Sequence, residues 1–219
     1  MPPTKPSDLL LLKNRAWAEE MKARDAGFFG RLAETQAPKF LWIGCADSRV
    51  PADAITGTRP GEIFVHRNIA NMVVHTDLNM LSVLSYAVNV LEVGHVIVCG
   101  HHGCGGVRAA MGTKDLGLIN KWLRNIKDVC AAHRDELAAI ADPQAREDRL
   151  VELNVTAQVH NLMKTTIIQR AWKRRNGPWL HAWVYDLGDG ILQELEAIAP
   201  GTPLEYPFAL EVDGAIDPE

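Results

Sequence analysis

The chain has 219 residues, of which 47% are hydrophobic and 23% charged, so it can bury a sizeable core as one large globular domain. Its formal net charge of −4 gives a nucleic-acid partner no electrostatic support. No apolar run approaches the roughly 20 residues of a membrane-spanning helix, and the N-terminus lacks the layout of a signal peptide, so we expect a cytoplasmic protein without a membrane partner.

Two helices are predicted before the first strand, over Ser7–Ala26 and Phe28–Thr35. They make up an N-terminal helical arm over residues 1–36 of a single domain that spans 1–219. The α/β core of this domain is predicted over 37–199. The remaining tail, 200–219, is expected to be loosely ordered or to pack on a partner subunit.

Strands and helices alternate through the predicted core. The predicted strands are Phe40–Ile43, Ile63–Asn68, His95–Gly100, Leu180–Asp186 and Ile191–Leu195. The predicted helices are a short one between Pro51 and Pro60, Leu78–Val93, one that begins near Gly105 or Gly106, Leu118–Ala139 and Asp148–Arg175. This alternation indicates the α/β class, with a central, mainly parallel β-sheet flanked by α-helices. The turn Gly188-Asp189-Gly190 adds a hairpin and an edge strand at the end.

Two segments that follow buried strands carry metal-binding side chains. The first is Gly44-Cys45-Ala46-Asp47-Ser48-Arg49, and the second is Gly100-His101-His102-Gly103-Cys104-Gly105-Gly106. Functional residues in open α/β sheets lie at the carboxyl ends of the strands. If these two strands are neighbours, Cys45, His101 and Cys104 converge. Two thiolates and an imidazole are a zinc ligand set, and three protein ligands leave the fourth position open for catalysis.

Other histidines and cysteines near these motifs are alternative ligands. His102 could bind the metal in place of His101, and Cys99 could replace Cys104. Because side chains alternate along a strand, we expect Cys99 to be a core residue. We expect His102 to line the cleft or to support a ligand, and Cys130 to be buried and inert.

Asp47 and Arg49 form a second informative pair, which charge counting explains. Two thiolates and a hydroxide on Zn²⁺ leave the metal site net negative, and a free carboxylate nearby would further oppose ionisation of a bound water or close the fourth position. Arg49 paired with Asp47 neutralises that carboxylate and holds it as a hydrogen-bond acceptor. Asp47 could then orient the attacking water or hydroxide.

The motifs C-x-D-x-R and H-x-x-C-G-G resemble those of the β-class carbonic anhydrases. The resemblance extends over roughly residues 5 to 195 and is strongest to bacterial members. It implies reversible hydration of carbon dioxide to bicarbonate and a proton, by a hydroxide on zinc held by Cys45, His101 and Cys104. It also implies that Asp47 and Arg49 are the catalytic dyad, and that the protein is a homodimer or homotetramer assembled through N-terminal arms.

Some members of the family have a second, non-catalytic bicarbonate site built from a Trp, an Arg and a Tyr. Trp42, Arg67 and Tyr185 stand at the matching places. The resemblance therefore implies allosteric regulation, in which bicarbonate or low pH frees Asp47 from Arg49. Asp47 then becomes the fourth zinc ligand of an inactive, closed state.

Two other functions fit the same motifs. The scaffold could hydrolyse an analogue of carbon dioxide such as carbon disulfide, or it could be a non-catalytic zinc protein that binds bicarbonate. The presence of both Asp47 and Arg49 favours the enzyme, because a structural zinc site needs neither an open position nor a dyad.

Overall fold

The computed structural model describes residues 5–213, which form two compact units, one up to Ala37 and one from Pro38. The first unit contains α1 (Pro6–Arg24) and α2 (Phe28–Glu34), close to the two predicted helices. Trp17 packs edge-on against Phe28 and Phe29. Neither helix buries a residue within the described structure, and Leu10 is 67% exposed. This unit therefore presents apolar side chains that its own two helices do not cover.

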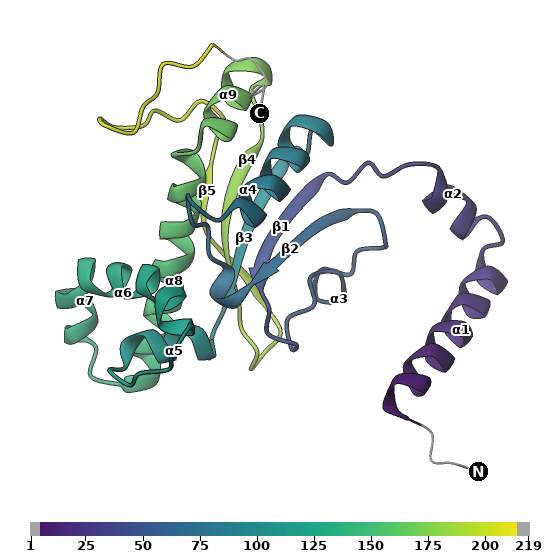
Figure 1. The fold of residues 1–219 in the computed structure, drawn as a ribbon, viewed down its shortest axis with the longest axis horizontal. Coiled ribbons are helices and arrows are strands. Elements are labelled where there is room, and N and C mark those ends of the chain that lie inside the picture. Colours follow the sequence, from purple (N-terminus) through teal and green to yellow (C-terminus); the bar gives the residue numbers. More distant parts are fainter. Residues whose placement is uncertain (1–4, 214–219) are drawn as a thin grey trace. The chain divides into compact units, whose positions relative to one another are not determined.

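The second unit is built on one five-stranded sheet with the order β2-β1-β3-β4-β5 (Figure 1). The strands are β1 (Phe40–Cys45), β2 (Ile63–Asn68), β3 (His95–His101), β4 (Trp179–Tyr185) and β5 (Leu192–Ile198). The pairs β1–β2, β1–β3 and β3–β4 are parallel, and β5 pairs antiparallel with β4 across the predicted hairpin. The predicted α/β class with a mainly parallel sheet is confirmed.

Two strands run further than their apolar residues predict. The prediction ended β1 at Ile43 and β3 at Gly100, whereas ladder pairing continues to Cys45 and to His101. Cys45 pairs in register with Asn68 of β2, and His101 with Tyr185 of β4. Cys45 and His101 are therefore the last residues of their strands. Their backbones are fixed by pairing with a neighbouring strand and do not belong to loops.

Seven helices and two short helical turns connect these strands. They are α3 (Ala52–Thr56), η1 (Ile69–Asn71), α4 (Leu78–Ser85), η2 (Tyr86–Val90), α5 (Gly105–Met111), α6 (Ile119–Ala132), α7 (Arg134–Ala139), α8 (Pro143–Met163) and α9 (Thr166–Arg175). Among the described residues, none of the helices combines the length and apolar character needed to cross a bilayer.

Two long predicted helices are each divided in the structure. The segment predicted over Leu118–Ala139 breaks at His133, and the one predicted over Asp148–Arg175 breaks at Lys164 and Thr165. At the second break the Thr165 hydroxyl accepts a hydrogen bond from the backbone N–H of Ile168 and so caps α9. The prediction missed these breaks because neither contains the glycine or proline that usually ends a helix.

The two faces of the sheet are covered unequally. The main core joins Leu41, Ile43, Val96 and Val98 to buried side chains of α4, α5, α6, α8 and α9. The opposite face carries a smaller cluster around Trp42, Ile97 and Cys99, against which Ala52 and Ile55 of α3 pack. Figure 1 shows α5, α6 and α7 gathered together, with α8 beside them. The site described below lies where β1 and β3 meet α5.

The described part of the tail packs on its own chain. Gln169 of α9 donates to the carbonyl of Phe208 at 3.0 Å and accepts from the N–H of Leu210 at 2.9 Å. Lys164 lies 4.4 Å from the centre of the Phe208 ring, a cation–π contact. Residues 214–219 of the predicted tail lie outside the described residues.

Gly100 fixes the distance between β3 and α8, which leads to a first prediction. A Cβ at this position would lie 2.4 Å from Cγ2 of Val155 and 3.3 Å from Oδ1 of Asn71. We expect Gly100→Ala to lower the free energy of unfolding by about 1–3 kcal/mol through overpacking, measured by urea denaturation.

Gly105→Ala is the matched control, because a Cβ there has no heavy atom within 4 Å. We expect its unfolding free energy to stay within about 0.5 kcal/mol of the parent. Equal effects of the two substitutions would show that β3 and α8 are not closely packed at Gly100.

Candidate metal centre

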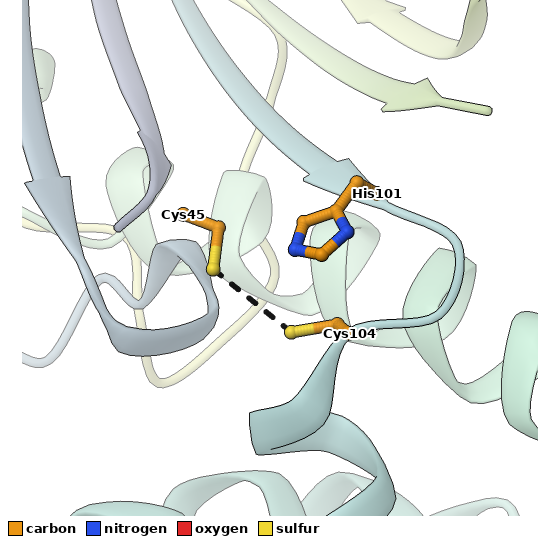
Figure 2. A group of neighbouring side chains, drawn as sticks. All are labelled: Cys45, His101 and Cys104. Carbon is orange, nitrogen blue, oxygen red and sulfur yellow. Dashed lines mark hydrogen bonds between the residues drawn. The ribbon is translucent and has the colours of Figure 1, made fainter. Parts of the chain in front are cut away.

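Cys45, His101 and Cys104 come together at the carboxyl ends of two neighbouring strands. Cys45 ends β1, His101 ends β3, and Cys104 is the residue before α5. The two sulfurs lie 4.0 Å apart, and one ligand atom from each residue falls within 4.8 Å of the others. Figure 2 shows the imidazole of His101 beside the two sulfur atoms. All three side chains are buried.

These residues fit a tetrahedral metal ion. Zinc–sulfur bonds of about 2.3 Å place two tetrahedral thiolates roughly 3.8 Å apart, close to the spacing observed. Nε2 of His101 is buried and has no hydrogen-bond partner among the described residues. Nδ1 of the same ring lies 3.0 Å from the carbonyl oxygen of His102 and can contact it only as a donor. The proton therefore sits on Nδ1, which leaves the lone pair of Nε2 for a metal.

When no metal ion is bound, the thiols of Cys45 and Cys104 together keep one proton. The hydrogen bond between the sulfurs of Cys45 and Cys104 lowers the pKa of the Cys45 thiol. The same hydrogen bond and burial raise the pKa of Cys104 far above its usual value. Loss of the second proton is thus opposed by the first thiolate. A bound cation removes that opposition, so metal binding and proton release are coupled at this site.

Backbone N–H groups lower the pKa of both ligand thiols. Those of Asp47 and Ala70 lower the pKa of the Cys45 thiol. Those of Val107 and Gly106, in the first turn of α5, have the same effect on Cys104. Such donors stabilise thiolates without placing a charged side chain beside the metal.

Asp47 is held by Arg49 in the loop after β1. The guanidinium donates from Nε to Oδ1 at 2.9 Å and from Nη2 to Oδ2 at 2.7 Å, and the N–H of Arg49 adds a bond of 3.0 Å to Oδ1. These contacts hold the pKa of Asp47 well below its usual range. Oδ2 lies 3.8 Å from Nε2 of His101. The carboxylate therefore stands beside the ligand set while both its oxygens are occupied by Arg49.

The alternative ligands lie elsewhere. Cys99 belongs to the cluster on the opposite face, and burial raises the pKa of its thiol far above the usual range. His102 points toward two carboxylates, with Nδ1 3.4 Å from Asp186 and Nε2 3.8 Å from Glu152. Its carbonyl, not its ring, serves the site by orienting His101. Cys130 is half-buried on α6 and lies outside the group.

Trp42 and Tyr185, two of the three residues predicted to form a bicarbonate site, pack in the same cluster on the opposite face. The indole of Trp42 lies over Gly44, where a Cβ would meet its Nε1 at 2.3 Å. Arg67 is the register partner of Gly44. Its guanidinium donates to the backbone carbonyls of Cys45, at 2.9 Å, and Asp47.

Asn68 and the turn that follows it also lie beside the ligands, although neither carries a motif that predicts this. Asn68 ends β2 beside Cys45, and its side chain holds both backbone groups of Met72. A signal was present, since Asn68 ends its strand as Cys45 and His101 end theirs. Asn is also a side chain that commonly bonds to nearby backbone.

Comparisons with known proteins agree with this geometry. The carbonic anhydrase family model matches residues 40–192. A carbonic anhydrase of Emericella nidulans is 49% identical over 194 residues, covering 89% of this chain and 85% of the relative. One of Pseudomonas aeruginosa is 39% identical over 176 residues, covering 77% and 78%. Both fungal and bacterial relatives match, so the expected likeness to bacterial members stays a prediction.

Solved structures show the same fold. One of two tetrameric β-carbonic anhydrases of Sordaria macrospora matches with a TM-score of 0.85 and 42% identity, covering 87% of this chain and 98% of that one. The Coccomyxa β-carbonic anhydrase in complex with acetazolamide matches with a TM-score of 0.84 and 38% identity, covering 91% and 89%. The chain therefore belongs to the β-carbonic anhydrase family, whose reaction is the reversible hydration of carbon dioxide to bicarbonate and a proton.

Proposed function

We propose that this carbonic anhydrase uses zinc held by Cys45, His101 and Cys104, and that Asp47 and Arg49 serve the reaction. The observation that carries the proposal is the convergence of three buried ligand atoms, one of them a nitrogen whose partner is missing from the described residues. Zinc, when bound, supplies the Lewis acidity that lowers the pKa of water toward neutrality.

The protein's own side chains then position the reactants. The carboxylate of Asp47 can accept a hydrogen bond from the attacking water and so direct its oxygen lone pair at the carbon of CO₂. Because Arg49 lowers the pKa of Asp47, the carboxylate stays ionised throughout the neutral range and keeps its role as an acceptor. Arg49 also keeps it from becoming a ligand. The proton released in the reaction leaves to buffer.

We further propose that Trp42, Arg67 and Tyr185 form a regulatory bicarbonate site. The contacts of Arg67 support a route to the dyad, because its guanidinium holds the backbone carbonyls of Cys45 and Asp47. An anion that draws this guanidinium away would loosen the loop that carries Asp47. Asp47 could then leave Arg49 and take the fourth position on the metal.

Two proposals concern the setting of the enzyme. We propose a homotetramer, built from dimers through the N-terminal arms. The exposed leucines of α1 and the tetrameric Sordaria macrospora relatives support it. We also propose a cytoplasmic location, because Cys45, Cys99, Cys104 and Cys130 are free thiols and the two that face the metal must stay reduced.

The cysteine ligands can be tested by metal content. We expect Cys45→Ala and Cys104→Ala each to reduce bound zinc from one equivalent per chain to near zero, because a thiolate ligand is lost. Cys99→Ala is the control, since that thiol is buried on the other face and should leave the zinc content unchanged. Metal analysis by mass spectrometry decides, and a full zinc equivalent in Cys45→Ala would contradict the assignment.

The dyad can be tested by the pH dependence of CO₂ hydration. We expect Asp47→Ala to lower kcat/KM by about 10²-fold or more at pH 8 to 9 with zinc retained. Arg49→Ala frees the carboxylate to bind the metal, so its activity should be low from pH 6 to 9. Arg124→Ala, which breaks only an exposed ion pair with Asp128, is the matched control. Unchanged kinetics in Asp47→Ala would remove the dyad from the mechanism.

The regulatory site predicts low activity of the parent at mildly acidic pH. This loss cannot be protonation of Asp47, whose pKa is held below its usual range. We expect Tyr185→Phe to weaken inhibition by bicarbonate roughly tenfold, because one hydrogen bond to an anion is lost. Tyr86→Phe, on the other side of the sheet, should change nothing. A parent profile that is flat from pH 6 to 9 would rule out the switch.

A further inference from the structure

The turn that follows β2 adopts an unfavourable backbone conformation beside the metal centre. Ala70 and Asn71 are consecutive left-handed residues, with φ values of 62° and 49°. A residue with a Cβ pays roughly 1–2 kcal/mol for this conformation, so it persists only where the surroundings hold it. The turn is buried against β1, and Ala70 and Asn71 are 0% and 2% exposed.

The side chain of Asn68 closes this turn. Its Oδ1 accepts from the N–H of Met72 at 2.7 Å, and its Nδ2 donates to the carbonyl of Met72 at 2.8 Å. One amide thus pairs with both backbone groups of one residue, as a neighbouring strand would. The backbone of Asn68 belongs to the sheet, where its carbonyl accepts from the N–H of Ala46 at 2.8 Å. Asn68 therefore ties the turn directly to the loop that leaves Cys45.

Side chains from distant helices hold the rest of the turn. Nδ2 of Asn154 on α8 donates to the carbonyl of Ala70 at 3.2 Å. Nε1 of Trp122 on α6 donates to the carbonyl of Ile69 at 2.8 Å, and Oε1 of Gln158 accepts from the N–H of Val73 at 2.8 Å. Backbone groups on both sides of the left-handed pair are thereby fixed.

The helix that carries Cys104 packs closely against the same turn. A Cβ on Gly106 would lie 3.0 Å from Cγ2 of Ile69, 3.3 Å from Cβ of Ala70 and 3.9 Å from the sulfur of Cys104. Ala70 therefore lies against the first turn of α5, which directly follows the ligand Cys104. On the side that faces α5, the turn and the helix that carries Cys104 are therefore in close contact.

We propose that the segment from Asn68 to Val73 positions the metal ligand Cys45, and that Asn68 is the residue that holds the segment in place. Its amide closes the left-handed turn, while its backbone pairs in register with Cys45 and its carbonyl accepts from the N–H of Ala46, the next residue. Asn68 touches neither metal nor substrate in this role, so it is a positioning residue. The inference rests on the proposed ligand set.

The chemistry requires an amide rather than a carboxylate. Nδ2 of Asn68 faces two acceptors, the carbonyl of Met72 and Nε2 of His66 at 3.2 Å. Asp has the same shape but would place a carboxylate oxygen against the carbonyl oxygen of Met72. Asn68→Asp therefore removes the hydrogen bond that Nδ2 donates to the carbonyl of Met72 and replaces it with repulsion between two oxygen atoms. The side-chain volume hardly changes.

The test uses Co²⁺ in place of zinc, because its thiolate charge-transfer absorption reports on the sulfur ligands directly. We expect Asn68→Asp to bind Co²⁺ about 10- to 100-fold more weakly in competition with a chelator, as is typical when a residue supporting a ligand is changed. We also expect its charge-transfer band to shift. Asn125→Asp is the matched control, since it removes a similar bond of 3.0 Å from Nδ2 to the carbonyl of Trp122. It should stay within twofold of the parent.

A second pair of variants separates positioning from stability. Asn154→Leu removes the donor to Ala70 without adding charge, and it should weaken Co²⁺ binding in the same direction. It serves as the primary variant if circular dichroism shows that Asn68→Asp is unfolded. Ala70→Gly keeps the N–H and relieves the cost of positive φ, so adding it to the primary variant should restore part of the lost affinity.

The outcomes are distinct. Parent-like affinity and spectrum in folded Asn68→Asp or Asn154→Leu would overturn the positioning role. Failure of Ala70→Gly to restore any affinity would overturn the part assigned to the left-handed turn. A parent protein that binds Co²⁺ without a thiolate band would overturn the ligand set itself.

Discussion

Parallel pairing of β1 with β3 is the constraint on which the metal centre depends. Because the two strands are in register from Phe40 and His95 onward, their carboxyl ends meet at one edge of the sheet. Cys45 and His101 are the last residues of these strands, so the sheet fixes their backbones before any ion binds. Cys104 follows after a tight turn in which Gly103 has a φ of 67°. Two ligands on rigid strands and a third at a helix start make a preorganised site, and the ordering entropy that metal binding must overcome is correspondingly small.

Negative charge at this edge must be balanced locally. The two sulfurs lie 4.0 Å apart and the carboxylate of Asp47 lies 3.8 Å from the ring of His101, so negative charges gathered at this edge oppose one another's ionisation. The chain meets this with backbone N–H groups at the sulfurs and with the guanidinium of Arg49 at Asp47. The thiolates and the carboxylate are stabilised by different groups because the thiolates are permanent ligands and Asp47 is not. A fixed N–H stabilises a ligand permanently, whereas Arg49, whose side chain is 58% exposed, is a partner that can be released. This difference is what makes the proposed switch at Asp47 physically available.

The sheet and the ligand motifs could be predicted because their causes are local. Apolar runs marked the strands, and the glycines around Cys104 marked a turn at a strand end. The helix breaks at His133 and Lys164 could not be predicted, because they arise from packing rather than from glycine or proline. The turn at Ala70 was missed for a related reason. The groups that hold it come from Trp122, Asn154 and Gln158, which are distant in sequence and share no motif with it. Their amides and indole lie on helical patterns, where a polar side chain is ordinarily a solvent-facing one.

Strand β2 contributes no ligand, yet two of its side chains support the metal centre from opposite faces of the sheet. From β2, Arg67 holds the backbone carbonyls of Cys45 and Asp47, while Asn68 holds the turn that packs against β1 and α5. Because side chains alternate along a strand, these neighbours reach opposite faces of the sheet. Arg67 shares the face that carries Trp42, and Asn68 shares the face that carries the core. A signal that moved Arg67 would therefore reach the loop of Asp47 while the bonds from Asn68 to Met72 stay in place. Cys45, His101 and Cys104 would keep the metal while Asp47 replaced water at the fourth position. A reversible switch requires that the ligand change without loss of the metal.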